Sequence, residues 1–228
     1  LYFHNNVSGT ITLLESMKKK GIKKIVFSST ASVYGEKNIS PIAESDVIDC
    51  KNNYALTKHS VEKILEYEKK TDSKWGVVIL RYFNPIGAHP SGIIGEDSNN
   101  ASNLMPHILN VASKHQKFLE VYGSDYLTKD GTAIRDYIHI MDLADGHIGA
   151  LNYLLSFDDF TVFNLGTGNG VSVVDLVNAF EEANSIQIPF KYLPRRRGDA
   201  QEIYANVELA KDKLGWTSKK TLENMCLD

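Results

Sequence analysis

Tyr54 and Lys58 are the residues of this sequence best suited to acid–base chemistry. They are four residues apart, so on a helix both side chains project from one face. A free tyrosine ionises near pH 10, and each unit of depression of its pKa requires about 1.4 kcal/mol. A close ammonium in a partly desolvated site could supply the roughly 4 kcal/mol that lowers this pKa by three units. The pair therefore indicates a phenolic general base, although most pairs with this spacing are exposed decoration on a helix.

Three hydroxyl side chains, Ser28, Ser29 and Thr30, lie where the apolar run of residues 22–28 ends. In an open α/β sheet, ligands bind beyond the carboxyl ends of the strands. A hydroxyl at this strand end can converge with the Tyr54–Lys58 pair. This placement favours a catalytic role for the pair over a decorative one.

Apolar periodicity predicts the elements that must position these groups. We expect helices over 5–20, 52–70, 103–115, 142–155, 173–183 and 208–214, and strands over 22–28, 75–82 and 161–165. Helices that alternate with strands across short joints predict right-handed βαβ crossovers and a parallel sheet. Residues 87–135 are richer in Gly, Asn and Ser, and we expect a smaller α/β substrate domain there and in the later part of the chain.

Composition excludes several classes of protein. The 228 residues are 43% apolar and 23% charged, with a net charge of −3, which leaves no excess of positive charge to attract nucleic acid. No apolar run approaches the roughly 20 residues that span a bilayer. Two cysteines, Cys50 and Cys226, cannot form a disulfide framework, which predicts a reducing compartment, the cytoplasm.

Two features resemble binding motifs, but we expect neither to bind a ligand. Residues 166–170 read GTGNG after a strand, but this is GxGxG spacing rather than the GxGxxG of a dinucleotide site, so we expect a tight turn. The seven histidines have no HExxH-like grouping, and we expect no metal site.

Several long motifs give the chain a family resemblance. They are FSSTASVYG (27–35), YALTK (54–58), LRYFNPIGAHPSG (80–92), NLMP (103–106), DGTAIRDYIHIMDLADGH (130–147) and PRRRGD (194–199). In unbroken order over the whole chain, they resemble the UDP-glucose (UDP-galactose) 4-epimerases of the extended short-chain dehydrogenase/reductase family. The resemblance implies an α/β fold, with a Rossmann-type doubly wound parallel sheet and a smaller α/β substrate-binding domain.

The resemblance also implies roles in catalysis and cofactor binding. Tyr54 would be the general base, Lys58 would lower its pKa and bind the nicotinamide ribose, and Thr30 would be the third active-site hydroxyl. Ser28, Tyr54 and Lys58 would contact NAD, together with Asn5 in the helix before them and Phe83 beside the nicotinamide.

The UDP-sugar would be held by a second set of residues. Asn84, Asn103 and Leu104 would bind the diphosphate and uridine, and Tyr122 would lie by the uracil. Arg135 and Arg196 would pair with the diphosphate, because a guanidinium fork matches phosphate oxygens. The remaining members of the set are Thr30, the ribose acceptor Asp199, and Ile203, which stands at the position that gates the sugar pocket.

The Gly-rich turn that would cradle the NAD pyrophosphate is missing from the sequence. We expect it upstream of Leu1, together with the first strands of the sheet. The predicted NAD-binding domain is therefore partial, spanning 1–84 and about 136–168, and the UDP-sugar-binding domain spans 85–135 and about 169–228.

By resemblance, the activity is NAD-dependent interconversion of UDP-glucose and UDP-galactose in galactose metabolism, through oxidation at C4, rotation of the 4-keto sugar and re-reduction. Isoleucine at 203 in place of a bulky aromatic predicts some tolerance of UDP-GlcNAc and UDP-GalNAc. The full-length protein would be a homodimer. UDP-glucuronate decarboxylases and UDP-sugar 4,6-dehydratases are relatives with the same scaffold, but dehydratases commonly have Asp-Glu where this sequence has Ala31-Ser32. A non-catalytic UDP-sugar-binding protein is the alternative from another class.

Overall fold

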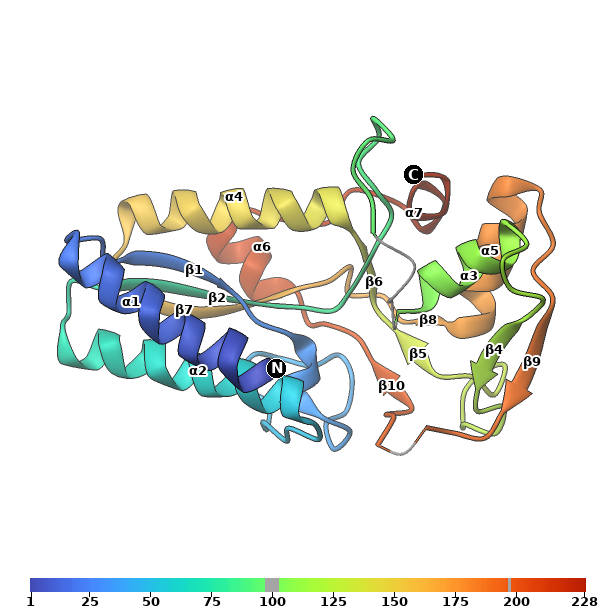
Figure 1. Cartoon of the computed structure of the whole chain (residues 1–228), viewed down its shortest axis with the longest axis horizontal. Coiled ribbons are helices and arrows are strands. Elements are labelled where there is room, and N and C mark those ends of the chain that lie inside the picture. The colour runs from blue at the N-terminus through green and yellow to red at the C-terminus, as the bar shows by residue number, and fades with distance from the viewer. Residues whose placement is uncertain (97–102, 197) are drawn as a thin grey trace.

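The computed structural model describes residues 1–96, 103–196 and 198–228, as a chain of helices and mostly short strands (Figure 1). The helical elements are η1 (Phe3–Ser8), α1 (Gly9–Lys19), η2 (Ala31–Tyr34), α2 (Asn53–Thr71), α3 (Leu104–Ala112), α4 (Ile140–Ser156), α5 (Val173–Asn184), α6 (Glu208–Leu214) and α7 (Leu222–Leu227). The strands are β1 (Lys24–Ser28), β2 (Gly76–Tyr82), β3 (Asn84–Ile86), β4 (Leu119–Tyr122), β5 (Ile134–Arg135), β6 (Tyr137–His139), β7 (Phe160–Leu165), β8 (Val171–Ser172), β9 (Phe190–Leu193) and β10 (Glu202–Ile203).

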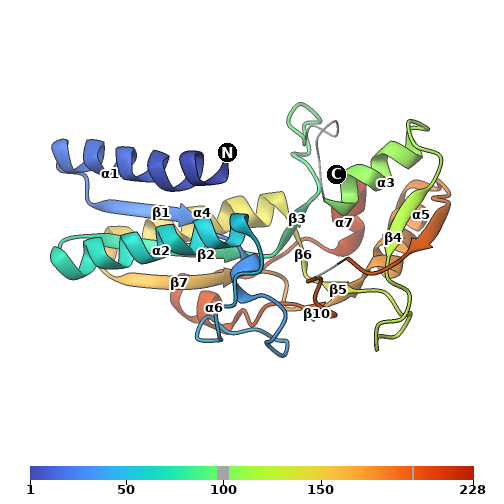
Figure 2. The same ribbon diagram turned by 60° about the horizontal axis from the view of Figure 1, so that its bottom comes forward.

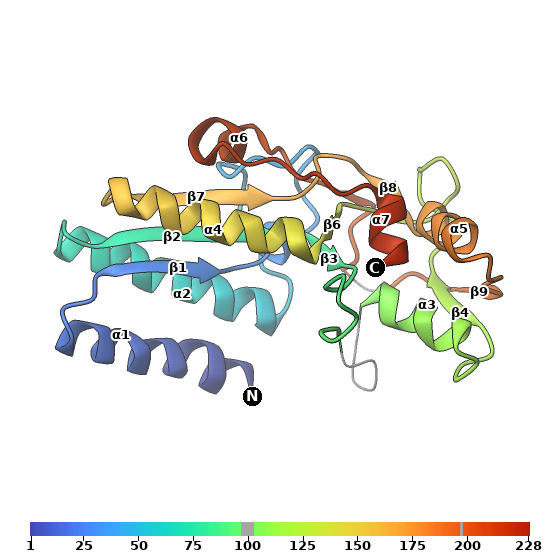
Figure 3. The same cartoon turned by 90° about the horizontal axis from the view of Figure 1, so that it is seen from above.

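A parallel sheet in the order β1-β2-β7 is the centre of the larger unit. Helices α1 and α2 cover one face of this sheet and α4 covers the other (Figure 3). The central strand β2 alternates its side chains between two cores: Val77 and Ile79 pack with α1 and α2, whereas Val78 and Leu80 pack with α4. The predicted α/β fold with a parallel sheet is therefore confirmed, and the carboxyl ends of β1 and β2 lie at one edge.

A cap and a turn fix the two elements that hold the predicted catalytic residues. The side chain of Asn52 accepts a hydrogen bond from the Ala55 N–H at 2.8 Å and so caps the N-terminus of α2. Tyr54 is the second residue of this helix. The Thr30 side chain accepts from the Ser32 N–H at 3.1 Å and begins η2 directly after β1. Thr30 and Tyr54 therefore each lie at the N-terminal end of a helix, η2 and α2 respectively.

A smaller unit lies beyond the carboxyl ends of the strands (Figure 2). Its core joins α3, α5 and α7 with the parallel pair β4–β9, through buried side chains that include Ile108, Leu176, Phe180 and Met225. The pairs β3–β6 and β5–β10 connect this unit to the sheet. In the described part of the chain, no helix is long and apolar enough to cross a membrane.

Packing departs from two sequence expectations. The apolar run at 22–28 predicts a buried strand, but β1 is only half-buried, since among the described residues it pairs on one side alone, with β2. Helix α6 falls in the segment 169–228 predicted for the smaller domain, yet Ala210 and the nearby Trp216 pack in the core shared by β2, β7 and α4. The predicted domain limits otherwise stay a prediction.

Candidate active site

Thr30, Tyr54 and Lys58 come together at the carboxyl end of β1. Thr30 is buried directly after the strand, and Tyr54 lies half-buried in the first turn of α2, beside the Thr30 hydroxyl. The Lys58 ammonium lies 5.8 Å from the centre of the Tyr54 ring and donates a hydrogen bond to the Ser28 carbonyl oxygen at 2.9 Å. The structure therefore gathers the phenol, the ammonium and the hydroxyl predicted to act together.

The expected depression of the Tyr54 pKa is wrong for the chain by itself. Burial raises the pKa of Tyr54, the nearby Tyr82 adds to this, and the hydrogen bond with Thr30 is what lowers it. Burial also lowers the pKa of the Lys58 ammonium. The physical reason is that desolvation is the largest influence on the pKa of Tyr54, and Lys58, whose ammonium bonds the Ser28 carbonyl oxygen, does not offset it.

Two adjoining cavities lie beside these groups, of about 350 Å³ and about 210 Å³. Asn84, Arg135 and Asp199 line both cavities, so they mark where the two meet. Each residue predicted to hold the UDP-sugar lines one cavity or the other. Thr30 and Ile203 line the smaller one, and the larger one is lined by Asn103, Leu104, Tyr122 and Arg196.

The larger cavity brings cations and an aromatic ring to the start of α3. The Arg196 guanidinium lies 3.8 Å from the centre of the Tyr122 ring, in stacking contact. Arg135 forms an ion pair with Asp199, and these side chains are 15% and 30% exposed. Two guanidinium groups at one wall suit a diphosphate, and the ring suits a planar base.

The smaller cavity reaches the predicted catalytic groups. Thr30 lies on its wall together with Tyr82 and the buried Phe83, and Ile203 of β10 lies on the wall as well. Tyr54 is not among the residues that line this cavity, but it lies beside Thr30, which does line it. A sugar in this cavity would therefore lie next to the phenol.

Of the five predicted cofactor residues, Phe83 lines the smaller cavity, and the other four line neither cavity: Asn5, Ser28, Tyr54 and Lys58. Asn5 is exposed on η1 and is not among the residues that line either cavity, whereas its neighbour Asn6 is half-buried and donates to Thr57 Oγ1 at 2.9 Å. Ser28 is half-buried, and its Oγ lies 2.9 Å from His147 Nε2. Ser28 still contacts Lys58 through its carbonyl oxygen.

Asp136, a fully buried carboxylate next to Arg135, was not predicted from the sequence. Its oxygens accept hydrogen bonds from the Thr167 N–H and hydroxyl at 2.7 Å, from the Gly168 N–H at 3.0 Å and from the Ala205 N–H at 3.1 Å. Burial raises the pKa of Asp136, and these hydrogen bonds oppose the increase. Asp136 therefore fixes Arg135 relative to the β10 region, and an acidic residue beside a predicted phosphate partner was the signal for it.

The glycine-rich segment at 166–170 is a turn, as predicted. Strand β7 ends at Leu165 and β8 begins at Val171, with the Asp136 carboxylate binding the turn between them. A Cβ on Gly166 would come within 2.3 Å of Asp136 Oδ2, so the close approach requires glycine there. Over residues 1–96, 103–196 and 198–228, no group of three or more His, Cys, Asp or Glu side chains could hold a metal ion.

Known proteins resemble the whole of this chain. The family described as "NAD dependent epimerase/dehydratase family" matches residues 1–166. The UDP-glucose 4-epimerase of Bacillus subtilis (strain 168) is 49% identical over 228 residues, which are 100% of this chain and 67% of that protein. UDP-glucose 4-epimerase 2 of Arabidopsis thaliana is 50% identical over 233 residues, which cover 100% of this chain and 66% of that protein.

Solved structures agree with the sequence relatives. A UDP-glucose-4-epimerase from Stenotrophomonas maltophila, with bound NAD and formylated UDP-arabinopyranose, superposes with a TM-score of 0.97 at 42% identity, over 100% of this chain and 68% of that one. The Bifidobacterium longum UDP-glucose 4-epimerase in complex with NAD+ and UDP gives a TM-score of 0.93 at 42% identity, over 99% of this chain and 68% of that one. The chain thus spans about two thirds of the length of its relatives.

Proposed function

The chain belongs to the NAD-dependent epimerase/dehydratase family, and from that premise we propose that it interconverts UDP-glucose and UDP-galactose as part of a UDP-glucose 4-epimerase. One observation carries this proposal. The Thr30 hydroxyl, which lies beside the Tyr54 phenol, lines a cavity that shares Asn84, Arg135 and Asp199 with a second cavity, lined by Arg196 and the Tyr122 ring. A nucleotide sugar has the same two-part layout, with a sugar at one end and a diphosphate and base at the other.

The cofactor of the proposed reaction is NAD, which the related structures contain. The residues present fit it, because the half-buried Lys58 ammonium, Ser28 and the Tyr54 hydroxyl gather at the carboxyl end of parallel strands, where nucleotide cofactors bind. These groups and Phe83 would hold NAD. When bound, NAD supplies reversible hydride transfer at C4 of the sugar.

In this mechanism Tyr54 moves the proton. Its phenolate takes the proton of the sugar 4-hydroxyl and returns it after the 4-keto sugar has turned over, while Thr30 donates a hydrogen bond to the reacting oxygens. Arg135 and Arg196 bind the diphosphate, and Asn103 and Tyr122 bind the uridine side. The UDP end is held by charge and the sugar by few contacts, so the sugar can rotate while UDP stays bound.

The test is conversion of UDP-galactose to UDP-glucose by the full-length protein with NAD, with and without the substitution Tyr54→Phe. We expect turnover to fall at least about 10³-fold in the variant while the Kd for UDP stays within about twofold, because Tyr54 lies outside the larger cavity. An inactive wild-type protein that binds UDP-sugars would support the non-catalytic alternative. Near-normal turnover of the variant would remove Tyr54 from the mechanism.

The same assay separates the dehydratase and decarboxylase alternatives. Elimination across C5 and C6 needs additional acid–base groups, and Ala31 and Ser32 supply no carboxyl group after Thr30. With UDP-glucose as the substrate, a 4-keto-6-deoxy product would favour the dehydratases, and with UDP-glucuronate as the substrate, release of CO2 would favour the decarboxylases.

Three finer features belong to the same proposal. Ile203 on the wall of the smaller cavity supports some activity on UDP-GlcNAc and UDP-GalNAc. A homodimer is expected from the family resemblance, and light scattering of the full-length protein would measure it. A cytoplasmic location fits two cysteines, Cys50 and Cys226, that are both free thiols.

A further inference from the structure

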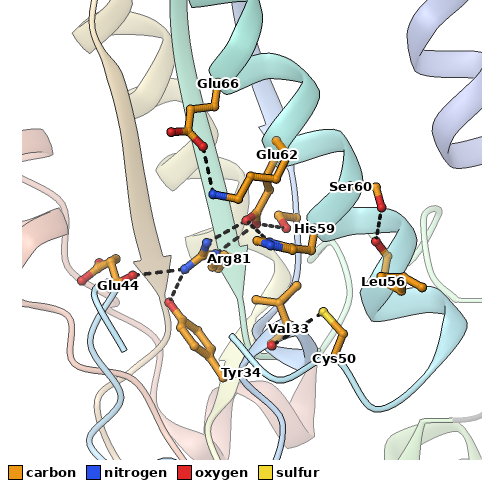
Figure 4. Close-up of polar contacts among 12 residues, drawn as sticks. Val33, Tyr34, Glu44, Cys50, Leu56, His59, Ser60, Glu62, Glu66 and Arg81 are labelled. Atoms are coloured by element: carbon orange, nitrogen blue, oxygen red, sulfur yellow. Dashed lines mark hydrogen bonds and ion pairs between the residues drawn. The ribbon is translucent and has the colours of Figure 1, made fainter. Parts of the chain in front are cut away.

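A buried ion pair lies behind the predicted catalytic groups, between Glu62 of α2 and Arg81 of β2 (Figure 4). Arg81 Nη2 donates to Glu62 Oε2 at 2.7 Å, and Arg81 Nε donates to Glu62 Oε1 at 3.0 Å. The two side chains are only 6% and 4% exposed. Two parallel hydrogen bonds from a planar guanidinium fix orientation as well as distance.

The pair also binds groups on the segments around it. Ser29 Oγ donates to Glu62 Oε1 at 2.5 Å, which ties the end of β1 to α2. Arg81 Nη1 donates to Tyr34 Oη at 3.1 Å and to the Glu44 carbonyl oxygen at 3.2 Å (Figure 4). One ion pair thus fastens β1, η2, α2 and β2 to one another.

Two of the groups that the pair holds, Ser29 and Tyr34, flank the segment that begins at Thr30. Ser29 directly precedes Thr30 in the chain, and Thr30 is the N-cap of η2, which ends at Tyr34. On α2, Glu62 lies one turn after Lys58, which lies one turn after Tyr54. Movement of the pair would therefore move the strand end against the helix, and the hydroxyl against the phenol.

We propose that the Glu62–Arg81 pair, with its bond to Ser29, is a positioning device that sets Thr30 against Tyr54 and Lys58. The inference rests on the proposed function for its catalytic meaning. Neither Glu62 nor Arg81 is among the residues that line the two cavities, so the pair acts only through the groups that it positions. A buried ion pair contributes little stability compared with apolar residues of the same shape. Its contribution here is to fix the relative orientation of the segments that it joins.

Two substitutions test the device in the full-length protein. Arg81→Lys keeps the positive charge but loses the planar fork and the bond to Tyr34. Ser29→Ala keeps the ion pair and removes only its link to the strand end, so it covers the case in which Arg81→Lys fails to fold. Glu66→Gln is the matched control, because Glu66 lies one turn further along α2 and its carboxylate accepts, among the described residues, only from the exposed Lys63 and Lys70.

The kinetic readout is turnover per UDP-binding site, with sites counted by calorimetric titration. We expect kcat to fall 10-fold or more for Arg81→Lys and Ser29→Ala, while their Kd for UDP stays within twofold of wild type. The kcat of Glu66→Gln should also stay within twofold of wild type. The acidic limb of the kcat–pH profile should move to higher pH, because Tyr54 loses the Thr30 hydrogen bond that lowers its pKa. A loss of binding sites that fully accounts for the loss of activity, with an unchanged pH profile, would overturn the inference.

A structural readout does not depend on activity. Crystal structures of the wild type and of both variants should differ in the distance from Thr30 Oγ1 to Tyr54 Oη, and they should agree around Arg196 and Tyr122. An unchanged distance in both variants overturns the inference, whatever the activity. If the distance changes but the wild type does not convert UDP-galactose, the positioning role stands and the proposed function fails.

Discussion

At the scale of single residues, the pKa of the Tyr54 hydroxyl is subject to two opposing influences. Burial raises its pKa and the Thr30 hydrogen bond lowers it, while the Lys58 ammonium is engaged by a carbonyl oxygen. A base must lose its proton before it can act, so in the proposed reaction Thr30 does more than contact the sugar. It also helps to keep the phenol ionisable, a role that a threonine or a serine can fill equally.

Thr30→Val should therefore shift the pH dependence of turnover. Valine keeps the shape of threonine but cannot bond the phenol, so the pKa of Tyr54 rises and the acidic limb of the kcat–pH profile moves to higher pH. At pH 7 we expect kcat to fall by about 10- to 100-fold. Thr30→Ser restores the hydroxyl and should leave the profile in place. Equal profiles for the valine and serine variants would contradict this role.

Ile203 decides how large a sugar the smaller cavity accepts. Its side chain is half-buried and lines the same cavity as Thr30, of about 210 Å³. Ile203→Tyr should reduce kcat/KM for UDP-GalNAc by at least about 10-fold, because the ring fills space that an N-acetyl group needs. UDP-galactose is the control substrate and should lose less than about threefold. No wild-type activity on UDP-GalNAc would refute the proposed tolerance.

At the scale of elements, the sequence predicts the long helices and strands whose apolar residues recur with a regular period. The helices α2, α4 and α5 and the strand β2 end within two residues of their predicted limits, because each has an apolar face over many residues. Strands such as β5 and β10 have two residues each and form only because Ile134 and Arg135 pair with a segment far along the chain. No local pattern encodes such a pairing.

The residues of the site were predictable for a different reason. Tyr54, Lys58 and the strand-end hydroxyls belong to contiguous motifs, and so do Arg135 and Arg196. The buried ion pair was not predictable, because Glu62 and Arg81 look in the sequence like ordinary charged residues. Only packing of α2 on β2 makes them buried partners.

The packing of α2 on β2 should depend on acid. Burial raises the pKa of Glu62, but hydrogen bonds from His59, Arg81 and Ser29 outweigh it and bring the pKa down to about 2, from an ordinary value of 4.5. A depressed carboxyl pKa contributes stability that is present above pH 4.5 and is lost as the pH falls towards 2. The contribution is about 3 kcal/mol at neutral pH.

Urea unfolding of the wild type and Glu62→Gln between pH 7 and pH 3 measures this contribution. At pH 7 the variant should be less stable by about 3–5 kcal/mol, because Arg81 is left as a buried, unpaired charge. The difference should narrow below pH 4.5. Glu66→Gln removes an exposed carboxylate from the same helix and should cost less than about 1 kcal/mol. A difference that stays constant from pH 7 to pH 3 would contradict the assignment.

At the scale of the whole molecule, the groups proposed for catalysis and those proposed for UDP binding lie in different units. Thr30 and Tyr54 stand on the sheet unit, whereas Tyr122 belongs to the smaller unit, and Arg135 lies on a strand between them. A nucleotide sugar in both cavities would connect the two units. Binding of UDP should therefore stabilise the fold without any help from the catalytic groups.

Thermal unfolding with and without UDP tests this division of labour. At a UDP concentration 100 times Kd, ligand binding adds about 2.7 kcal/mol, which corresponds to a rise in Tm of roughly 5–10 °C for a chain of this size. Tyr54→Phe should keep the full rise, because the phenol is not on the wall of the larger cavity. Arg196→Met, at the UDP concentration that saturates the wild type, should lose most of it, because the charge facing the diphosphate and the contact with Tyr122 are both removed. An equal rise in Tm for Arg196→Met would place the diphosphate elsewhere, and a lost rise in Tyr54→Phe would mean that the two units do not act separately.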